Sequence, residues 1–229
     1  MRTTVLIFAR YPQPGKVKTR MTPPLTPEEA AELHLASLRT VCESLQACRD
    51  LTSVLIVTPD ERANDLAAML ADHVAESWAQ GDGSLGERLC RTTDRAFEAG
   101  ADAVLMIGAD SPTLPVRLVR NALTALTSHE AVLGPTHDGG YYLLGLRGPI
   151  PLLFDRIDWG TDRVAEQTRQ RALEVGVVLA EVRSWYDLDR FDDLRPALED
   201  LSATDEPLGS AAASLERLIN SLLEKYPDG

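Results

Sequence analysis

Short apolar runs alternate with longer segments of helical periodicity through the first 130 residues of the chain. The runs at 5–9, 54–57 and 103–107 have the length of buried strands. Each is followed by a segment in which apolar residues recur every three or four positions, as on one face of a helix. Strands that alternate with helices form mainly parallel sheets with right-handed crossovers. The chain is therefore predicted to be an α/β protein.

Capping signals mark where two of the predicted helices begin. Thr26-Pro27-Glu28-Glu29 combines an N-cap threonine, a proline at the first helical position and a glutamate three residues after the cap, and it predicts a helix to about Ala47. Ser84-Leu85-Gly86-Glu87 is a second capping box and predicts a helix that ends near Gly100. Apolar periodicity predicts further helices with Leu66, Met69 and Leu70 facing inward, after Pro115, over 161–176 and from about Phe191.

The alternation of strands and helices breaks down after residue 130. The apolar runs 131–134 and 141–146 are separated by only six residues, which is too short for a helical crossover. Two strands so close in sequence are expected to pair as an antiparallel hairpin. We therefore expect a mainly parallel central sheet with a small antiparallel extension. One domain is expected over residues 1–200, and a linker and C-terminal helix over 201–229 that pack on it or extend from it.

The charge of the chain argues against two classes of partner. The 229 residues carry a formal net charge of -12, whereas nucleic acids and anionic membranes bind basic surfaces. No apolar run reaches the roughly 18 residues of a membrane span, and the run Val5–Ala9 is too short for a signal peptide. The three cysteines have neither paired nor metal-binding spacing. Reduced thiols and a cytoplasmic location are therefore expected.

The basic residues are concentrated near the start of the chain. Residues 1–27 contain five basic residues and no acid, and three of the five, Lys16, Lys18 and Arg20, follow Gly15 in a proline-containing loop. Backbone amides near glycine, together with lysine and arginine, can bind phosphate oxygens. The spacing fits neither a Walker A loop nor a dinucleotide-binding GxGxxG motif. The loop is thus either an anion site or a solvated basic loop.

Asp110 follows the most apolar of the predicted strands. The run Val104–Ile107 ends in Gly108-Ala109-Asp110-Ser111-Pro112, and open parallel sheets bind ligands just beyond such strand ends. Mg²⁺ is typically held by one or two carboxylates together with substrate phosphates. A second acid is therefore needed, and Asp187 and Asp189 are the candidates. The alternative is that these aspartates only stabilise turns or cap a helix.

Two glycine-rich segments complete the candidate site. Asp138-Gly139-Gly140 lies between the two strands of the expected hairpin, where glycine permits close approach of a ligand, or where it forms a plain turn. Residues 80–86 form a polar start to a helix, which can hold an anion or the edge of a base or act as a simple capped loop. We expect most of the histidines to be surface residues. His137, which lies beside Asp138, is the expected exception.

Four motifs occur in the order found in a known family. They are Phe8-Ala9-Arg10 with Pro12, Gly15 and Val17-Lys18-Thr19-Arg20; Gly81 with Leu85-Gly86 and Arg88; Ile107-Gly108 with Asp110-Ser111-Pro112 and Leu114; and Gly134-Pro135 with Asp138-Gly139-Gly140-Tyr141. Over about residues 4–200 the chain resembles the DUF2064 family of GT-A-like transferases, which are also labelled arsenosugar biosynthesis glycosyltransferases. Trp159-Gly160-Thr161 and Asp187-Leu188-Asp189 resemble later motifs of that family.

The resemblance implies a Rossmann-like GT-A fold, as in nucleotide-diphospho-sugar transferases. It also implies a nucleotide bound across the loop after the first strand, and Mg²⁺ or Mn²⁺ bound by Asp110 and Asp189. The chain departs from related enzymes in two places. Phe8-Ala9-Arg10 replaces the glycine-rich loop of sugar nucleotidyltransferases, and Asp110 stands alone where many glycosyltransferases have an Asp-x-Asp pair. Lys18-Thr19-Arg20 is similar to phospholactate guanylyltransferases, which keeps nucleotidyl transfer open.

We therefore expect a metal-dependent glycosyltransferase with a nucleotide-diphospho-sugar donor and a small-molecule acceptor. Asp110, Asp138 and Lys18 are the expected catalytic residues, and Asp138 or His137 is a candidate base. The expected nucleotide-binding residues are Ala9, Arg10, Gly15, Lys16, Lys18, Arg20, Gln80, Gly81, Leu85 and Gly86. The expected acceptor-binding residues are Asp138, Gly139, Gly140, Tyr141 and Trp159. The alternatives are nucleotidyl transfer from a nucleoside triphosphate to a phosphorylated or acidic acceptor, with release of pyrophosphate, and a non-catalytic nucleotide-binding module.

Overall fold

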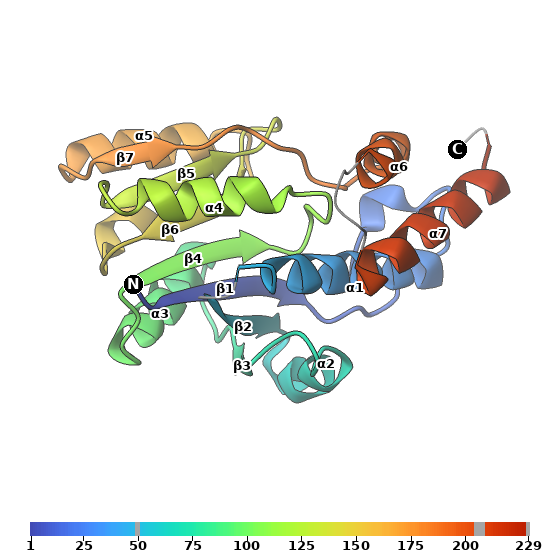
Figure 1. Cartoon of the computed structure of the whole chain (residues 1–229), viewed down its shortest axis with the longest axis horizontal. Coiled ribbons are helices and arrows are strands. Elements are labelled where there is room, and N and C mark those ends of the chain that lie inside the picture. The colour runs from blue at the N-terminus through green and yellow to red at the C-terminus, as the bar shows by residue number, and fades with distance from the viewer. Residues whose placement is uncertain (49–50, 204–208, 228–229) are drawn as a thin grey trace.

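One sheet organises the part of the chain that the computed structural model describes, which is residues 1–48, 51–203 and 209–227. Its strands are β1 (Thr3–Arg10), β2 (Leu51–Thr58), β3 (Glu76–Ala79), β4 (Ala103–Gly108), β5 (Ala131–Pro135), β6 (Tyr141–Leu146) and β7 (Leu179–Glu181). The order across the sheet is β3-β2-β1-β4-β6-β5-β7 (Figure 1). Strand β1, which is buried along most of its length, therefore lies between β2 and β4.

Only β6 runs against its neighbours in this sheet. Strand β1 pairs in parallel with both β2 and β4, and β5 pairs in parallel with β7. Strand β6 is antiparallel to β4 on one side and to β5 on the other. The predictions of an α/β fold, of a mainly parallel sheet and of a hairpin at 131–146 are confirmed.

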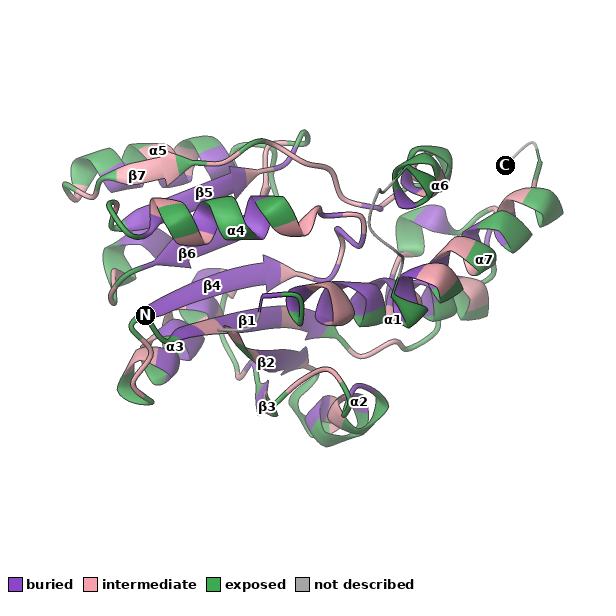
Figure 2. Cartoon of the chain, viewed as in Figure 1, coloured by how far each residue is buried: buried purple, intermediate pink, exposed green. Residues whose placement is uncertain are grey.

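Helices cover both faces of the sheet. They are α1 (Pro27–Leu45), α2 (Ala63–Met69), α3 (Leu85–Glu98), α4 (Val116–Ala125), α5 (Val164–Glu174), α6 (Leu194–Ser202) and α7 (Ser210–Lys225). Because successive side chains of a strand point to opposite faces, Val5 and Ile7 pack with α1, α2 and α4, whereas Leu6 packs with α3 and α5. Figure 2 shows the resulting buried centre between two helical layers. In the described residues no helix is both long and apolar enough to cross a membrane.

The predicted capping boxes form the starts of α1 and α3. The Thr26 hydroxyl accepts from the Glu29 amide at 3.2 Å, and the Glu29 carboxylate accepts from the Thr26 amide at 2.8 Å. Ser84 and Glu87 make the same reciprocal pair at the start of α3. The prediction for Met69 was wrong, because its side chain is 40% exposed. Helix α2 ends at this residue, and its other predicted apolar residues carry the contact with the sheet.

Helices α6 and α7 pack on the side of α1 that faces away from the sheet, in a cluster that includes Leu33, Leu194 and Leu215. The Glu43 carboxylate of α1 accepts from the Ala211 amide at 2.9 Å and so satisfies a donor at the start of α7. The linker expected after residue 200 lies partly outside the described residues, and helix α7 already begins at Ser210.

The chain changes from one face of the sheet to the other at β1. Helix α1, which leads from β1 to β2, lies on one face, and α3, which leads to β4 on the other side of β1, lies on the opposite face. Such a switch leaves a crevice beyond the carboxyl ends of the two strands. The fold therefore places the ends of β1 and β4, and with them residues 10–20 and Asp110, around one crevice.

Candidate functional site

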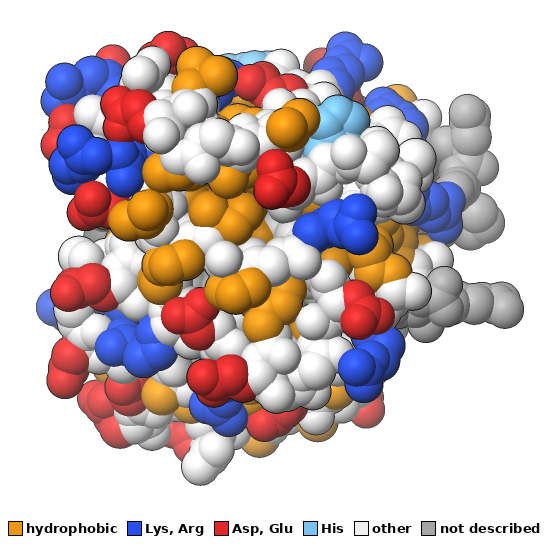
Figure 3. Space-filling view, turned by 90° about the vertical axis from the view of Figure 1, so that its left-hand side faces the viewer, with side chains coloured by type: hydrophobic (Ala, Val, Ile, Leu, Met, Phe, Trp, Pro, Cys, Tyr) orange, Lys and Arg blue, Asp and Glu red, His pale blue; other side chains and the backbone are white. Residues whose placement is uncertain are grey.

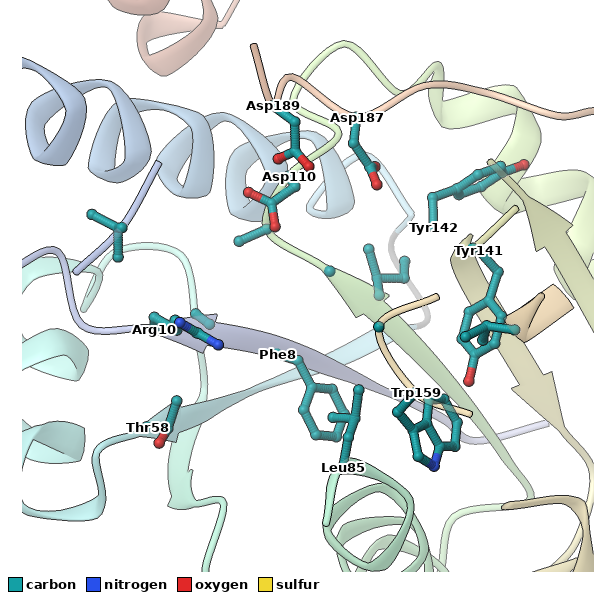
Figure 4. A pocket seen from close by; sticks show the side chains of 18 of the residues that line it. Phe8, Arg10, Thr58, Leu85, Asp110, Tyr141, Tyr142, Trp159, Asp187 and Asp189 are labelled. Carbon is teal, nitrogen blue, oxygen red and sulfur yellow. The ribbon is translucent and has the colours of Figure 1, made fainter. Parts of the chain in front are cut away.

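A pocket of about 860 Å³ opens beyond the carboxyl ends of β1 and β4. Its walls come from the loop after β1, from the ends of β2 and β4, and from segments around 138–142, 159–164 and 187–189. Figure 4 shows Asp110, Asp187 and Asp189 together at one side, with Arg10 and Trp159 at opposite ends. On the opposite side of the molecule, where β1 and β4 begin, acidic and basic side chains surround a group of apolar ones (Figure 3).

The segment after β7 brings two late aspartates to Asp110. The Val182 amide donates to the Leu133 carbonyl at 2.9 Å, the Trp185 amide donates to the Pro135 carbonyl at 3.1 Å, and the Leu188 amide donates to the Asp110 carbonyl at 2.7 Å. The segment thus follows the end of β5 and then reaches the end of β4. This path explains why residues nearly eighty positions apart in the chain share one pocket.

The short helix after these aspartates is capped by Asp193. This observation decides whether Asp187 and Asp189 are helix caps or pocket residues. Asp193 Oδ2 accepts from the amides of Asp189 at 2.8 Å and Arg190 at 2.6 Å. The Asp187 carboxylate instead accepts from the Ser111 hydroxyl at 2.5 Å, and the Asp189 carboxylate lies beside two cations. Asp187 and Asp189 are therefore pocket residues and not helix caps.

Lys18 lies at the centre of this group of carboxylates. Its side chain is 2% exposed, and its Nζ donates to Asp110 Oδ1 and, at 2.6 Å, to the Leu188 carbonyl. Asp189 Oδ1 lies 3.6 Å from the same Nζ, and Arg20 Nη1 lies 3.5 Å from Asp189 Oδ2. The Lys18 backbone has a φ of 48°, in the left-handed region. The loop turns there and directs the side chain inward.

The pKa shifts of these groups follow from the excess of carboxylates around the Lys18 ammonium. Burial would lower the pKa of Lys18, but Asp110, Asp189 and Asp187 raise it above its ordinary value. Withdrawal from water would raise the pKa of Asp110, but the Lys18 ammonium holds it below its usual range. Burial and the neighbouring carboxylates Asp110, Asp189 and Asp138 raise the pKa of Asp187 to about 6, against the Ser111 hydrogen bond. The site therefore attracts further positive charge.

The donor set fits a metal site that the protein completes only in part. Among the described residues, no three histidine, cysteine, aspartate or glutamate side chains converge as a full set of ligands. Asp110 and Asp189 are hard oxygen donors that already share one cation, Lys18. Since Mg²⁺ is typically bound by one or two carboxylates plus substrate phosphates, this pair matches what the protein would contribute.

His34 is the histidine that belongs to the pocket, contrary to the expectation for His137. The His34 ring is buried, and its Nε2 lies 3.0 Å from the Arg10 carbonyl oxygen. Burial lowers the pKa of His34, with Lys18 acting in the same direction, so the ring is neutral near pH 7. His137 is exposed and is not among the described residues that line the pocket. The sequence feature that could have identified His34 is its spacing, three residues after Ala31 and four before Leu38, on the inner face of α1.

Most of the expected nucleotide-binding residues line the pocket. They are Ala9, Arg10, Lys16, Lys18, Arg20, Gln80 and Leu85. The Gln80 amide group donates to the carbonyls of Ala9 and Ile56 and accepts from Arg88 at 2.8 Å, so it fixes the ends of β1 and β2. The expected glycines Gly15, Gly81 and Gly86 are outside the described lining. Gly15 and Gly81 have φ values of 74° and 75°, which only glycine adopts readily.

The expected acceptor-binding residues divide in the same way. Asp138, Gly140, Tyr141 and Trp159 line the pocket, while Gly139 packs behind it against Asp162. Asp138 Oδ1 accepts from the Thr136 hydroxyl at 2.6 Å and from the Gly140 amide at 3.1 Å, so one carboxylate oxygen also shapes the turn. Residues that line the pocket but that sequence reasoning did not select include Phe8, Thr58, Arg88 and Asp162. Phe8 and Arg88 stand inside the motifs quoted above.

Comparison with known proteins finds a matching family and a similar solved structure. The sequence profile of a family described as "Uncharacterized protein conserved in bacteria (DUF2064)" matches residues 41–161. A crystal structure from Desulfovibrio desulfuricans G20, provisionally assigned as a nucleotide-diphospho-sugar transferase, is 30% identical, covers 98% of both chains and has a TM-score of 0.87. The expected GT-A-like fold is confirmed by this likeness.

One relative and one protein of similar fold carry names of nucleotidyl transfer. The phosphoenolpyruvate guanylyltransferase of Sphaerobacter thermophilus is 32% identical over 133 residues, which are 58% of this chain and 63% of the relative. The chain thus matches less than two thirds of that curated protein. A nucleotidyl transferase from Methanothermobacter is 16% identical, with a TM-score of 0.60 over 89% of this chain and 99% of its own. At that identity the likeness concerns the fold alone.

Proposed function

The chain belongs to the DUF2064 family, and we propose that it is a metal-dependent transferase whose substrate is a nucleotide or a nucleotide sugar. The observation that carries this proposal is the cluster in which the Lys18 ammonium lies among the carboxylates of Asp110 and Asp189. The cluster occupies the crevice between β1 and β4, where open parallel sheets bind ligands. Metal-binding acids and phosphate-binding cations would thus share one crevice.

The charged residues of the pocket have complementary roles in this proposal. Arg10, Lys16 and Arg20 line the pocket and would bind phosphate oxygens. Asp110 and Asp189 would hold Mg²⁺ or Mn²⁺. When bound, the cation would supply positive charge against the departing diphosphate. Lys18 would keep the two carboxylates together and place its ammonium where negative charge develops during the transfer.

Nucleotidyl transfer is the reaction that we favour. The Sphaerobacter relative is named a phosphoenolpyruvate guanylyltransferase, and the loop Lys18-Thr19-Arg20 is similar to phospholactate guanylyltransferases. In this reaction an acceptor oxygen forms a bond to the α-phosphorus of a nucleoside triphosphate while the bond to pyrophosphate breaks. The basic loop would hold the pyrophosphate portion, and the far end of the pocket would receive the acceptor.

Glycosyl transfer is the second candidate because of one specific likeness. The Desulfovibrio structure that matches 98% of this chain is provisionally assigned to nucleotide-diphospho-sugar transferases. In that case a sugar carbon would be attacked, a nucleoside diphosphate would leave, and Asp138 would be the candidate base. The same cations and carboxylates would bind the diphosphate, so the two reactions differ chiefly in the bond that breaks.

A thermal-shift screen tests the binding part of this proposal. Nucleoside triphosphates, nucleoside diphosphates and nucleotide sugars are added with Mg²⁺, with Mn²⁺ or with EDTA. A ligand present at 100 times its Kd stabilises the folded state by about 2.7 kcal/mol. We expect stabilisation by at least one class, larger with metal than with EDTA. A flat screen contradicts the whole proposal.

The released product then separates the two reactions. The stabilising ligand is incubated with a mixture of phosphorylated and hydroxylated small molecules, and phosphorus NMR identifies what leaves. Pyrophosphate from a nucleoside triphosphate supports nucleotidyl transfer, and a nucleoside diphosphate from a nucleotide sugar supports glycosyl transfer. Metal-dependent binding without either product supports the non-catalytic alternative.

A further inference from the structure

The end of the pocket farthest from Arg10 has a character of its own. Tyr141, which begins β6, and Trp159 contact each other edge to face, with ring centroids 6.4 Å apart and an interplanar angle of 80°. Figure 4 shows both rings at this end of the pocket, near Leu85. Asp138 and Asp162 also line the pocket, and their loops meet where Gly139 packs against the Asp162 backbone. We call the wall formed by Tyr141, Trp159, Asp138 and Asp162 the aromatic wall.

Two glycines shape the aromatic wall. A Cβ at Gly86 would lie 2.7 Å from Trp159 Nε1 and 2.8 Å from the Phe154 carbonyl oxygen, so only glycine lets the indole approach α3 so closely. A Cβ at Gly139, which has a φ of 92°, would lie 1.9 Å from the Asp162 carbonyl oxygen. The Ala165 amide also donates to the Gly139 carbonyl at 2.9 Å. The wall is therefore a packed assembly of two loops and not a chance meeting of side chains.

The Tyr141 hydroxyl is a polar group without a partner in this wall. The oxygen is buried, and it makes no hydrogen bond to any of the described residues. Burial raises the pKa of the Tyr141 phenol, so the hydroxyl keeps its proton and can both donate and accept. A buried hydroxyl that stays unpaired costs about 1–3 kcal/mol. Tyr141 therefore brings to the pocket lining a donor and acceptor that no described residue uses.

The aromatic wall also lacks positive charge of its own. Among the described lining residues between 138 and 164 there is no lysine, arginine or histidine. Most cations of the pocket lie at the end of β1 or on the loop after it, and Arg88 on α3 donates from Nη1 to the Gln80 side chain at 2.8 Å. The aromatic wall thus contributes two carboxylates and no cation to the lining of the pocket.

We infer that the aromatic wall binds an acceptor whose body carries hydrogen-bond donors and no anionic group. Rings and apolar faces of such a body would pack on Trp159, while its O–H or N–H groups would donate to Asp162 and to the Tyr141 hydroxyl. An acceptor with a second anionic group would meet unopposed carboxylates. The reactive group of the acceptor would point toward Lys18 and Asp110. This inference rests on the proposed function, since it concerns the acceptor of the same transfer.

The acceptor inferred for this protein differs from the substrate in the name of the Sphaerobacter relative. Phosphoenolpyruvate, the substrate in the name of the Sphaerobacter protein, carries a carboxylate beside its phosphate on a three-carbon body. Such a compound has no hydroxyl or ammonium donor for Asp162. The structure therefore assigns Asp162 as a specificity-determining residue against acceptors of that class.

Ligand-observed NMR on the full chain tests this inference. The protein is saturated with a guanosine triphosphate analogue that has a methylene group between the α- and β-phosphates, together with Mg²⁺. Three probes are then titrated: glucose 1-phosphate, phosphoethanolamine and phosphoenolpyruvate. We expect at least one of the first two to bind at least tenfold more tightly than phosphoenolpyruvate. The glucose 1-phosphate arm reports hydroxyl donors, and the phosphoethanolamine arm reports an ammonium donor.

Charge reversal provides the matched comparison. Asp162→Lys is expected to tighten phosphoenolpyruvate binding at least tenfold, whereas Glu166→Lys, the same reversal on an exposed residue of α5 outside the lining, is expected to leave it unchanged. If Asp162→Lys does not fold, Asp162→Asn is expected to tighten phosphoenolpyruvate and weaken the preferred probe, each about threefold. The thermal shift of the nucleotide analogue is measured on the same samples. Two results, each with the nucleotide shift present, would overturn the inference while the proposed nucleotide site stands. One is that phosphoenolpyruvate binds the unaltered protein as well as the other probes do, and the other is that no probe binds. A missing shift would instead count against the proposed function.

Discussion

Replacing Lys18 with methionine removes one charge from the centre of the site while keeping most of the side-chain volume. The Lys18 side chain is 2% exposed and lies between Asp110 and Asp189. Removing one partner of a fully buried ion pair costs about 3–5 kcal/mol, because the other charge stays buried without compensation. The Asp110 side chain is 46% exposed, so water offsets part of this cost. We expect Lys18→Met to destabilise the metal-free protein by roughly 2 kcal/mol.

Thermal unfolding in EDTA measures this loss. For a chain of 150–250 residues each kcal/mol changes the Tm by about 2–4 °C, so the variant should unfold about 4–8 °C below the unaltered protein. Added Mn²⁺ should then stabilise the variant more than it stabilises the unaltered protein, because the carboxylates have lost their own counter-ion. Both measurements use the same protein and buffer, with metal as the single difference.

Arg20→Met is the matched control for this experiment. It removes the same charge from a residue that contacts Asp189 at 3.5 Å but whose side chain is 63% exposed. Exposed ion pairs contribute about 0–1 kcal/mol, so its Tm in EDTA should fall little. Equal losses in the two variants, or an equal effect of Mn²⁺ on Lys18→Met and the unaltered protein, would refute the role of Lys18 as the counter-ion of this site.

Three further predictions concern the supports of the site and of the C-terminal helix. Gly86→Ala should destabilise the protein by about 1–3 kcal/mol in urea unfolding and weaken acceptor binding more than nucleotide binding, because its Cβ would displace Trp159; equal weakening of both ligands would contradict this. Glu43→Ala should cost about 1 kcal/mol, because it removes the acceptor for the amides at the start of α7; unchanged urea unfolding would count against that contact. Burial would raise the pKa of Glu29, but hydrogen bonds from Lys225, the Thr26 amide and Tyr226 lower it to about 2. A carboxyl group whose pKa is lowered in the folded state stabilises the fold above its ordinary pKa of 4.5, and this contribution is lost as the pH falls toward 2. The Tm of Glu29→Gln should therefore approach that of the unaltered protein as the pH falls over this range. A Tm difference that stays constant would contradict the role of Glu29.

The sheet and the helix starts were predictable because local signals specify them. The apolar runs at 5–9 and 103–107 became adjacent parallel strands, and Thr26 and Ser84 cap helices as their spacing predicted. Asp110 was found in the same way, since a strand end in an open sheet places the residue after it at the crevice. Each of these inferences needs only a few neighbouring residues and a repeat of known period.

Features that depend on tertiary contacts were harder to anticipate. The sequence left open whether Asp187 and Asp189 cap a helix, and only the position of Asp193 and the path of the segment along β5 place both in the pocket. Lys18 was expected beside phosphate, and its contact with the carboxylates of Asp110 and Asp189 required the packing of segments far apart in the chain. His34 was missed because a histidine on an apolar helix face is usually a minor feature, whereas here the face borders the pocket.

Calorimetric titration of GTP into the unaltered protein and into Asp110→Asn, each with Mg²⁺ and with EDTA, tests the central claim most directly. The exposed Asp192 provides a matched control as Asp192→Asn. The account predicts that Mg²⁺ tightens GTP binding at least tenfold in the unaltered protein and in Asp192→Asn, and that Asp110→Asn loses this gain while its unfolding remains cooperative. An equal gain from Mg²⁺ in Asp110→Asn would contradict the assignment of Asp110 as the residue at which metal and nucleotide meet.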